Sequence, residues 1–225
     1  MKEISMDFFR DEVRNGFFIP TAVKQAWAAQ LQVLDVIETI CRKHDITYFA
    51  DWGTILGTVR HGGYVPWDDD MDICMKREDY TRFKEAAKTE LPKDFRIHDY
   101  EHQEDHWLFL SRVANSVHIN FEPEHMKQFH NFPYIAGIDI FVLDYLYKDE
   151  QQEKQRCEEV KHIIAVADSI IAGEIAQPVK EANLIQLEEK YHKTYNRKLD
   201  NRHMGIELYR LAEEQMARVP KEESD

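Results

Sequence analysis

Four aspartates stand within five positions of this chain, at Asp68, Asp69, Asp70 and Asp72. Carboxylates this close together repel one another, and burial makes their charged forms still less favourable. The surrounding stretch, PWDDDMDIC, also contains several apolar residues, so the cluster needs a source of positive charge. A divalent cation is the simplest source, because carboxylate oxygens are its usual ligands. The cluster therefore predicts metal-dependent chemistry on a phosphate-bearing substrate.

Asp70 and Asp72 are the pair that we expect to hold the metal. A strand is predicted at Met71–Met75, and residues two apart on a strand face the same side of the sheet. The two carboxylates would then lie side by side and could hold one or two Mg²⁺ ions, with Mn²⁺ as an alternative. Asp68 and Asp69 are interpreted as supporting residues around this pair or as turn residues.

A third carboxylate on a neighbouring strand would complete such a site, and Asp139 is the best candidate. It is the acidic residue of the apolar stretch YIAGIDIFVL, Tyr134–Leu143, which is predicted to be a strand. Strongly apolar strands seldom carry a carboxylate without a role. The alternative is that Asp139 is a core acid paired with a nearby arginine or lysine.

A Gly-Thr pair, Gly53-Thr54, stands where a short predicted strand, Ile46–Ala50, leads into a predicted helix over ILGTVRH. Backbone N–H groups at the start of a helix, together with a hydroxyl, can bind a phosphate group. The alternative is an ordinary helix cap, a position that threonine also fills well.

The combination of Gly-Thr, Asp-x-Asp and a distant Asp resembles the nucleotidyltransferase fold. The longer stretch WGTILGTVRHGGYVPWDDDMDICMKREDY is similar to the LicD family of phosphotransferases, the group related to fukutin. The resemblance covers roughly residues 25–145. It implies an α+β fold with a nucleotidyltransferase-like mixed sheet, flanking helices and a C-terminal helical part.

The resemblance also implies an activity. Such enzymes transfer a phosphorylated alcohol, most often phosphocholine from CDP-choline, to a hydroxyl of a cell-surface glycan such as teichoic acid or lipopolysaccharide. Asp70, Asp72 and Asp139 would then be the catalytic metal ligands, and Asp139 is also a candidate to accept the proton of the attacking hydroxyl. Gly53 and Thr54 would bind the donor phosphates.

Two arginines extend the site that the resemblance implies. Arg60 and Arg77, in the segments RHGG and KRED, could neutralise the phosphates or the leaving CMP. A structural salt bridge to the acidic cluster is the alternative for both.

Other functions are compatible with parts of the pattern. A nucleotidyltransferase that moves a nucleotide to a small hydroxyl compound would share the metal site, and a non-catalytic metal-binding scaffold would share the carboxylates. The aspartates could also form a solvated acidic turn. A calcium-binding EF-hand loop does not fit, because Ile73 stands where that loop needs a glycine.

The chain is predicted to have two parts. Residues 1–147 form the catalytic core, in which helices are expected at residues 21–43 and 77–87 and further strands at Phe95–Ile97 and Trp107–Val113. Residues 148–225 read as a helical region interrupted at Pro178. The family resemblance implies a further C-terminal segment with a Tyr-Gly-Asp-Tyr type motif, which this sequence lacks.

Composition restricts the partners. A formal net charge of −13 over 225 residues opposes binding to nucleic acid, because phosphate contacts need lysine and arginine. No apolar run predicts a transmembrane segment. Three cysteines without a Cys-x-x-Cys pair favour a reducing compartment. We expect a cytoplasmic protein, able to act at the inner face of the membrane, that binds a CDP-activated alcohol and a glycan or lipid-linked glycan acceptor. The oligomeric state is not predicted.

Overall fold

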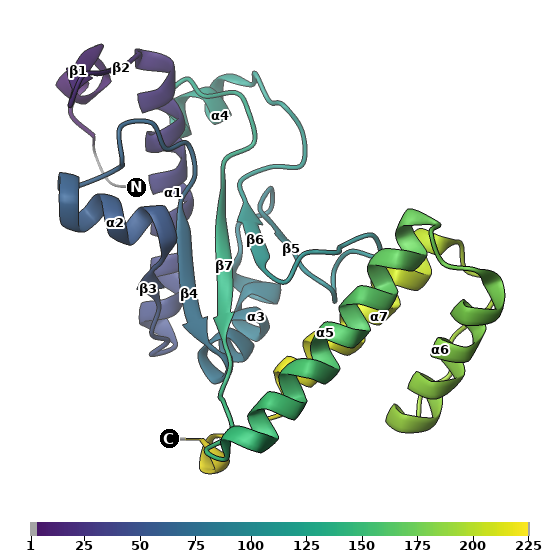
Figure 1. Cartoon of the computed structure of the whole chain (residues 1–225). Coiled ribbons are helices and arrows are strands. Elements are labelled where there is room, and N and C mark those ends of the chain that lie inside the picture. The colour runs from purple at the N-terminus through teal and green to yellow at the C-terminus, as the bar shows by residue number, and fades with distance from the viewer. Residues whose placement is uncertain (1–3, 225) are drawn as a thin grey trace. The chain divides into compact units, whose positions relative to one another are not determined.

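A computed structural model describes residues 4–224, and its architecture is the mixed α+β arrangement that the sequence predicts (Figure 1). The described chain divides into two compact units. The first unit combines the described part of Met1–Asp99 with Leu110–Leu143, and the second combines Tyr100–Phe109 with the described part of Asp144–Asp225. The aspartates, Gly53-Thr54 and Asp139 all belong to the first unit.

The first unit is built on a five-stranded sheet with the order β3-β4-β7-β6-β5. The central strands β4 and β7 are parallel, and the other neighbouring pairs are antiparallel. The strands are β3 (Phe49–Ala50), β4 (Asp72–Lys76), β5 (Arg96–His98), β6 (Ser111–Ala114) and β7 (Gly137–Leu143).

Side chains along the central strands point alternately to the two faces of the sheet, so that one face is apolar and the other is charged. Ile73 and Met75 of β4, and Ile138 and Ile140 of β7, are 0–1% exposed and form part of the hydrophobic core. Burial of each such side chain stabilises the fold by about 1.5–3 kcal/mol. The residues between them, which include the candidate metal ligands, therefore point to the opposite face.

Two long helices, α1 (Thr21–Lys43) and α3 (Arg77–Glu90), cover the apolar face of the sheet. Both confirm predicted helices. In α1 the residues Val33, Ile37 and Ile40 recur at helical spacing and are at most 2% exposed. Phe83 is the completely buried residue of α3.

The helix α2 (Trp52–His61) follows β3 and includes Gly53 and Thr54 in its first turn. Asp51 caps this helix, because its side chain accepts a hydrogen bond from the backbone N–H of Trp52 at 2.9 Å. The helix ends at Gly62, which has a left-handed φ of 67° that glycine adopts without steric cost.

Several elements differ from the sequence-based expectations. The predicted strand Ile46–Ala50 is reduced to β3, and the predicted strand Trp107–Val113 is wrong over most of its length, because β6 begins at Ser111. Residues 100–109 belong instead to the second unit. Strand β4 begins at Asp72, so Asp70 lies in the loop before the strand rather than on it.

The N-terminal part of the first unit contains elements that the sequence analysis missed. A short 3-10 helix, η1 (Met6–Phe9), precedes the hairpin of β1 (Glu12–Arg14) and β2 (Phe17–Ile19). The hairpin turns at Asn15-Gly16, both of which have positive φ. A short helix, α4 (Pro123–Gln128), lies between β6 and β7 in sequence.

The second unit confirms the predicted C-terminal helical part. Its helices are α5 (Glu150–Ala172), α6 (Gln177–Tyr191) and α7 (Asn201–Met216), followed by a 3-10 turn, η2 (Lys221–Glu223). Their core includes Ile163, Ile170, Leu184 and Leu208, all 0% exposed. Within residues 4–224, we find no helix whose length and apolar character would let it cross a membrane.

Candidate active site

The charged face of the sheet carries a row of three side chains on three adjacent strands. Asp72 of β4 lies opposite Asp139 of β7, and Asp139 lies opposite Arg112 of β6. Residues opposite one another in register point to the same face, so the three side chains are neighbours. Asp72 is 8% exposed and Asp139 is 9% exposed. The fold thus brings together two carboxylates that are 67 positions apart in sequence.

Arg112 holds Asp139 through two parallel hydrogen bonds. Its Nε donates to Oδ1 at 2.5 Å and one terminal nitrogen donates to Oδ2 at 2.7 Å. This fork geometry is the strongest form of an arginine–carboxylate pair, and the hydrogen bonds to Asp139 raise the pKa of Arg112. Asp139 therefore has the arginine partner that the alternative interpretation expected, and it also faces Asp72. Arg112 itself was missed by the sequence analysis.

Asp72 lies in a strongly negative environment. Burial raises the pKa of its carboxyl from the ordinary value of 3.8 to about 6, and the charges of Asp70 and Asp139 contribute to the same shift. Asp68 and Asp51 add smaller effects of the same sign. The carboxylates of the loop and of the sheet are therefore close enough to interact electrostatically.

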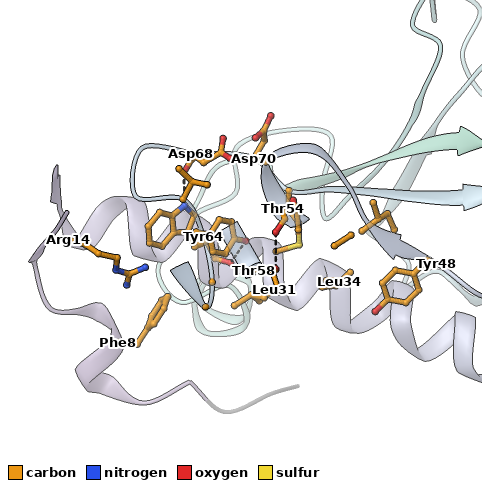
Figure 2. Close-up of a pocket in the computed structure, with 18 residues that line it drawn as sticks. Phe8, Arg14, Leu31, Leu34, Tyr48, Thr54, Thr58, Tyr64, Asp68 and Asp70 are labelled. Carbon is orange, nitrogen blue, oxygen red and sulfur yellow. Dashed lines mark hydrogen bonds between the residues drawn. The ribbon is translucent and has the colours of Figure 1, made fainter. Parts of the chain in front are cut away.

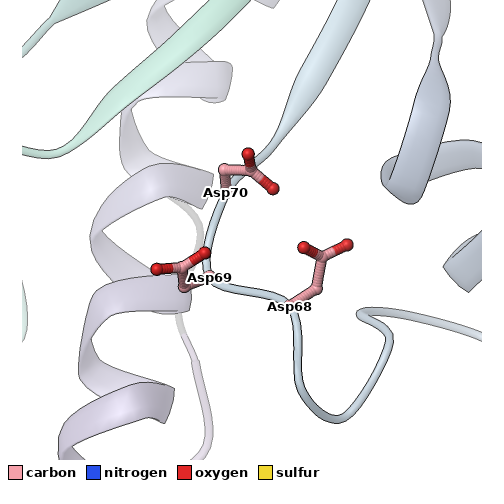
Figure 3. Close-up of side chains that lie close together, drawn as sticks. All are labelled: Asp68, Asp69 and Asp70. Atoms are coloured by element: carbon pink, nitrogen blue, oxygen red, sulfur yellow. The ribbon is translucent and has the colours of Figure 1, made fainter.

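The loop before β4 presents a convergent set of three carboxylates, Asp68, Asp69 and Asp70 (Figure 3). One oxygen from each lies within 4.8 Å of the others. Burial, followed by a hydrogen bond and charge repulsion from Asp70, raises the pKa of Asp68 to about 6. Such a set of hard oxygen donors suits Mg²⁺ or Mn²⁺, so the residues present fit the expected metal. Asp68 and Asp69, interpreted from the sequence as supporting or turn residues, therefore belong to the same carboxylate set as Asp70.

Helix α1 fixes the backbone of this loop. The indole Nε1 of Trp27 donates to the carbonyl of Asp68 at 2.8 Å, and Gln30 Nε2 donates to the carbonyl of Asp69 at 2.7 Å. The Trp27 ring also stacks on Tyr64, with ring centroids 4.7 Å apart. Since both bonds are to main-chain carbonyls, they hold the loop and leave its carboxylates to face outward.

Gly53 lies in direct contact with the side chain of Asp68. A Cβ atom at position 53 would lie 2.2 Å from Oδ2 of Asp68, so the carboxylate would have to move. The first turn of α2 and the aspartate loop therefore pack directly against each other. This contact couples the predicted phosphate-binding glycine to the predicted carboxylate cluster.

Thr54 links α2 to the start of β4. Its Oγ1 accepts a hydrogen bond from the backbone N–H of Asp72 at 2.8 Å. A hydroxyl that accepts still carries one hydrogen to donate. Directly after the neighbouring strand β3, the backbone N–H of Asp51 donates to the carbonyl of Asp72 at 3.0 Å, so the backbone N–H and C=O of Asp72 are both bonded.

A cavity of about 620 Å³ adjoins the aspartate loop (Figure 2). Asp68 and Asp70 line one edge of it together with Gly53 and Thr54. The rest of the lining is largely apolar or aromatic and includes Phe8, Leu31, Leu34, Tyr48 and Tyr64, with Arg14 as the cation. The volume is in the range of pockets that enclose a small organic ligand, roughly 300–1,000 Å³.

The two arginines of the predicted site lie away from the carboxylates. Arg60 is exposed in the last turn of α2, seven residues beyond Gly53 and about 10 Å along the helix axis. Arg77 begins α3 at the other end of β4 from Asp72, about 16 Å away along the strand, and its guanidinium lies over the Tyr80 ring. The structure brings neither next to the aspartates, whereas it does bring Arg112.

Comparison with known proteins points to one family. The family model described as LicD/FKTN/FKRP, nucleotidyltransferase domain, matches residues 45–165, which is more than half of the chain. The chain belongs to the LicD family. The LicD-matched region contains β3, α2, the aspartate loop and the row formed by Asp72, Asp139 and Arg112.

Individual relatives of this LicD-family chain align over a shorter stretch. The lipopolysaccharide cholinephosphotransferase LicD of Haemophilus influenzae is 43% identical over 53 residues, which is 24% of this chain and 20% of that protein. An uncharacterized protein of Rickettsia typhi is 39% identical over 54 residues, 24% of this chain and 18% of the relative. The aligned stretch thus spans about a fifth of each relative.

Proposed function

We propose that this protein transfers a phosphorylated alcohol, phosphocholine in the first instance, from a CDP-activated donor to a hydroxyl of a cell-surface glycan. The observation that carries the proposal is the convergence of carboxylates from one loop and two strands inside the LicD-matched region. The name of the Haemophilus influenzae relative, a lipopolysaccharide cholinephosphotransferase, supports phosphocholine as the group transferred.

In this proposal Asp70, Asp72 and Asp139 hold Mg²⁺, or Mn²⁺ in its place, and Asp68 and Asp69 support them. A divalent cation at such a site would neutralise the donor phosphates and stabilise the charge that develops on the leaving group. Burial, and after it the charges of neighbouring aspartates, raise the pKa values of Asp68 and Asp72. A bound cation would relieve the repulsion among these carboxylates.

The remaining residues position these groups. Arg112 orients Asp139 through one hydrogen bond to each carboxylate oxygen, and each oxygen keeps a further lone pair for a cation. Thr54 keeps one hydroxyl hydrogen that can be donated to a donor phosphate. Gly53 gives Asp68 the room that it needs. The neighbouring cavity can accommodate the nonpolar parts of the donor.

Product analysis tests which phosphorus–oxygen bond is attacked. The protein is incubated with Mg²⁺, CDP-choline and a glycan acceptor such as lipopolysaccharide or teichoic acid, and separately with Mg²⁺, CTP and phosphocholine. Products are identified by ³¹P NMR and mass spectrometry. The proposal predicts CMP from the first mixture. Release of pyrophosphate from the second mixture, with no CMP from the first, would instead assign nucleotidyl transfer.

A further inference from the structure

Aromatic side chains continue the charged face of the sheet beyond its two carboxylates. Phe141 stands two residues after Asp139 on β7, so it points to the same face, about 7 Å farther along the strand. Phe49 of β3 lies opposite Cys74 of β4, and Cys74 lies opposite Phe141, which places the Phe49 ring on this face too. Phe49 is 45% exposed, so this part of the sheet is open to solvent.

Trp52 extends over this surface from the first turn of α2. The centre of its indole is 5.9 Å from the centre of the Phe141 ring, and the two ring planes are inclined at 55°. Trp52 nevertheless remains 64% exposed. The contact with Phe141 therefore positions the indole beside the carboxylates and leaves most of the residue accessible to a ligand.

The backbone of Trp52 is strained. Its φ is 42°, in the left-handed region that a bulky residue rarely adopts. Strain of this kind costs folding stability and persists where the position of a residue matters for function. An indole that stays largely exposed gains little from burial, so packing alone does not account for the conformation.

A flat ring suits such an indole, because aromatic faces stack on one another and on nucleobases. Trp52 directly precedes Gly53 and Thr54, which adjoin the aspartate loop and β4, so a ligand stacked on the indole can carry its phosphates to those residues. In a nucleotide the ribose separates the base from the phosphate by a distance similar to the about 7 Å between Asp139 and Phe141 along β7.

The choline group fits this surface less well. Only two carbons separate its ammonium from the phosphate oxygen, so it would stay closer to the metal-binding carboxylates than a base would. Quaternary ammonium groups are recognised by aromatic cages, in which several ring faces surround the cation. Trp52 and Phe141 are in contact with each other and leave no gap between their rings for such a group.

We propose that Trp52 stacks on the cytosine base of the CDP-activated donor while the donor phosphates lie at the aspartates and Gly53-Thr54. This inference rests on the proposed function, because that function supplies the nucleotide. Trp52 acts on binding of the base and takes no part in the bond that is broken.

The test is a calorimetric titration of the full chain, in Mg²⁺, with two probes: CMP and ribose 5-phosphate, which lacks the base. The unmodified protein should bind CMP more tightly than ribose 5-phosphate. Trp52→Leu should weaken CMP binding by about tenfold and leave ribose 5-phosphate binding unchanged, because only the stacking contact is lost. Trp52→Phe should recover most of the affinity for CMP, since phenylalanine keeps an aromatic face.

Phe18→Leu is the matched control, because it removes an aromatic ring that is 56% exposed from β2 and should leave both affinities unchanged. All three variants should melt within a few degrees of the unmodified protein, since both positions are exposed.

Three results would overturn the inference. The first is equal affinity of the unmodified protein for CMP and ribose 5-phosphate, and the second is unchanged CMP affinity in Trp52→Leu. The third is an equal loss for both probes in Trp52→Leu, which would mean that the substitution disturbs the phosphate site.

The proposed transfer reaction fails in a different way. CMP binding that depends on Trp52, without CMP release from CDP-choline in the presence of an acceptor, would support the stacking contact and contradict the transfer. CMP release with an affinity for CMP that is independent of Trp52 would support the transfer and overturn the stacking contact.

Discussion

Asp72 and Asp139 lie opposite each other on the parallel strands β4 and β7, with Arg112 next in the same row. One arginine faces two carboxylates of the sheet, and three more carboxylates converge in the adjacent loop. The local excess of negative charge means that the folded protein holds these groups at an electrostatic cost, as functional sites often do. The expected consequences concern the arginine, the glycine that makes room for Asp68, and the charge of Asp72.

Replacement of Arg112 by lysine keeps a positive charge but removes the two parallel hydrogen bonds to Asp139. We expect turnover of the CDP-activated donor to fall by about 10–100-fold, because Asp139 loses its fixed orientation. The expected stability loss is smaller, about 1 kcal/mol, since the Arg112 side chain is half exposed. Steady-state kinetics and urea unfolding measure the two effects. Turnover equal to that of the unmodified protein would mean that Arg112 does not position Asp139 for the reaction.

Replacement of Gly53 by alanine should displace Asp68, because the added Cβ would lie 2.2 Å from its Oδ2. We expect weaker Mg²⁺ binding, by about tenfold, in a calorimetric titration. Gly63→Ala is the matched control, since a Cβ at position 63 meets no atom within 4 Å.

The same contact can be tested by a double-mutant cycle. In an Asp68→Ala background the alanine at position 53 has no carboxylate to displace, so its effect on Mg²⁺ binding should largely vanish. If the effect of Gly53→Ala is unchanged in that background, the contact with Asp68 is not its cause.

The charge of Asp72 should make the metal-free protein less stable as the pH rises. The folded pKa of about 6 lies above the ordinary 3.8, so the folded protein binds more protons than the unfolded chain between these values. Stability therefore falls as the pH increases through this window. Asp72→Asn should raise the free energy of unfolding by about 1–3 kcal/mol at pH 7, and by less near pH 4.5. Urea unfolding at both pH values in EDTA measures the difference, and a destabilised variant at pH 7 would contradict the account.

The loop carboxylates and the strand acid Asp139 could be predicted from sequence because local spacing carries their signal. Asp68 to Asp72 are contiguous, and Asp139 stands out as a charge within an apolar strand. The hairpin β1-β2 was missed, although Asn15-Gly16 is a common two-residue turn and could have predicted it. Its strands have three residues each, which is too short for an alternation of apolar and polar residues to predict them.

Arg112 could not be assigned in the same way. Its partnership with Asp139 depends on the register between β6 and β7, which are antiparallel and linked by a long connection that contains α4. A shift of one residue would turn Arg112 to the apolar face, and no local pattern specifies that register. Conversely, Arg77 is close to Asp72 in sequence but is separated from it by the full length of β4. Sequence proximity therefore drew attention to Arg77, whereas the arginine that contacts Asp139 is Arg112.

The central claim is that the aspartates hold a divalent cation that the transfer reaction requires. The most direct measurement is the rate of CMP release from CDP-choline, with a glycan acceptor such as lipopolysaccharide or teichoic acid present, against Mg²⁺ concentration. It is made for the unmodified protein and for Asp70→Asn/Asp72→Asn. Asp45→Asn, at an exposed position in the same unit, serves as the control. The account predicts saturable Mg²⁺ dependence, loss of activity in EDTA, and a rate at least about 100-fold lower in the double variant. CMP release that is equally fast in the double variant, or unaffected by EDTA, would contradict it.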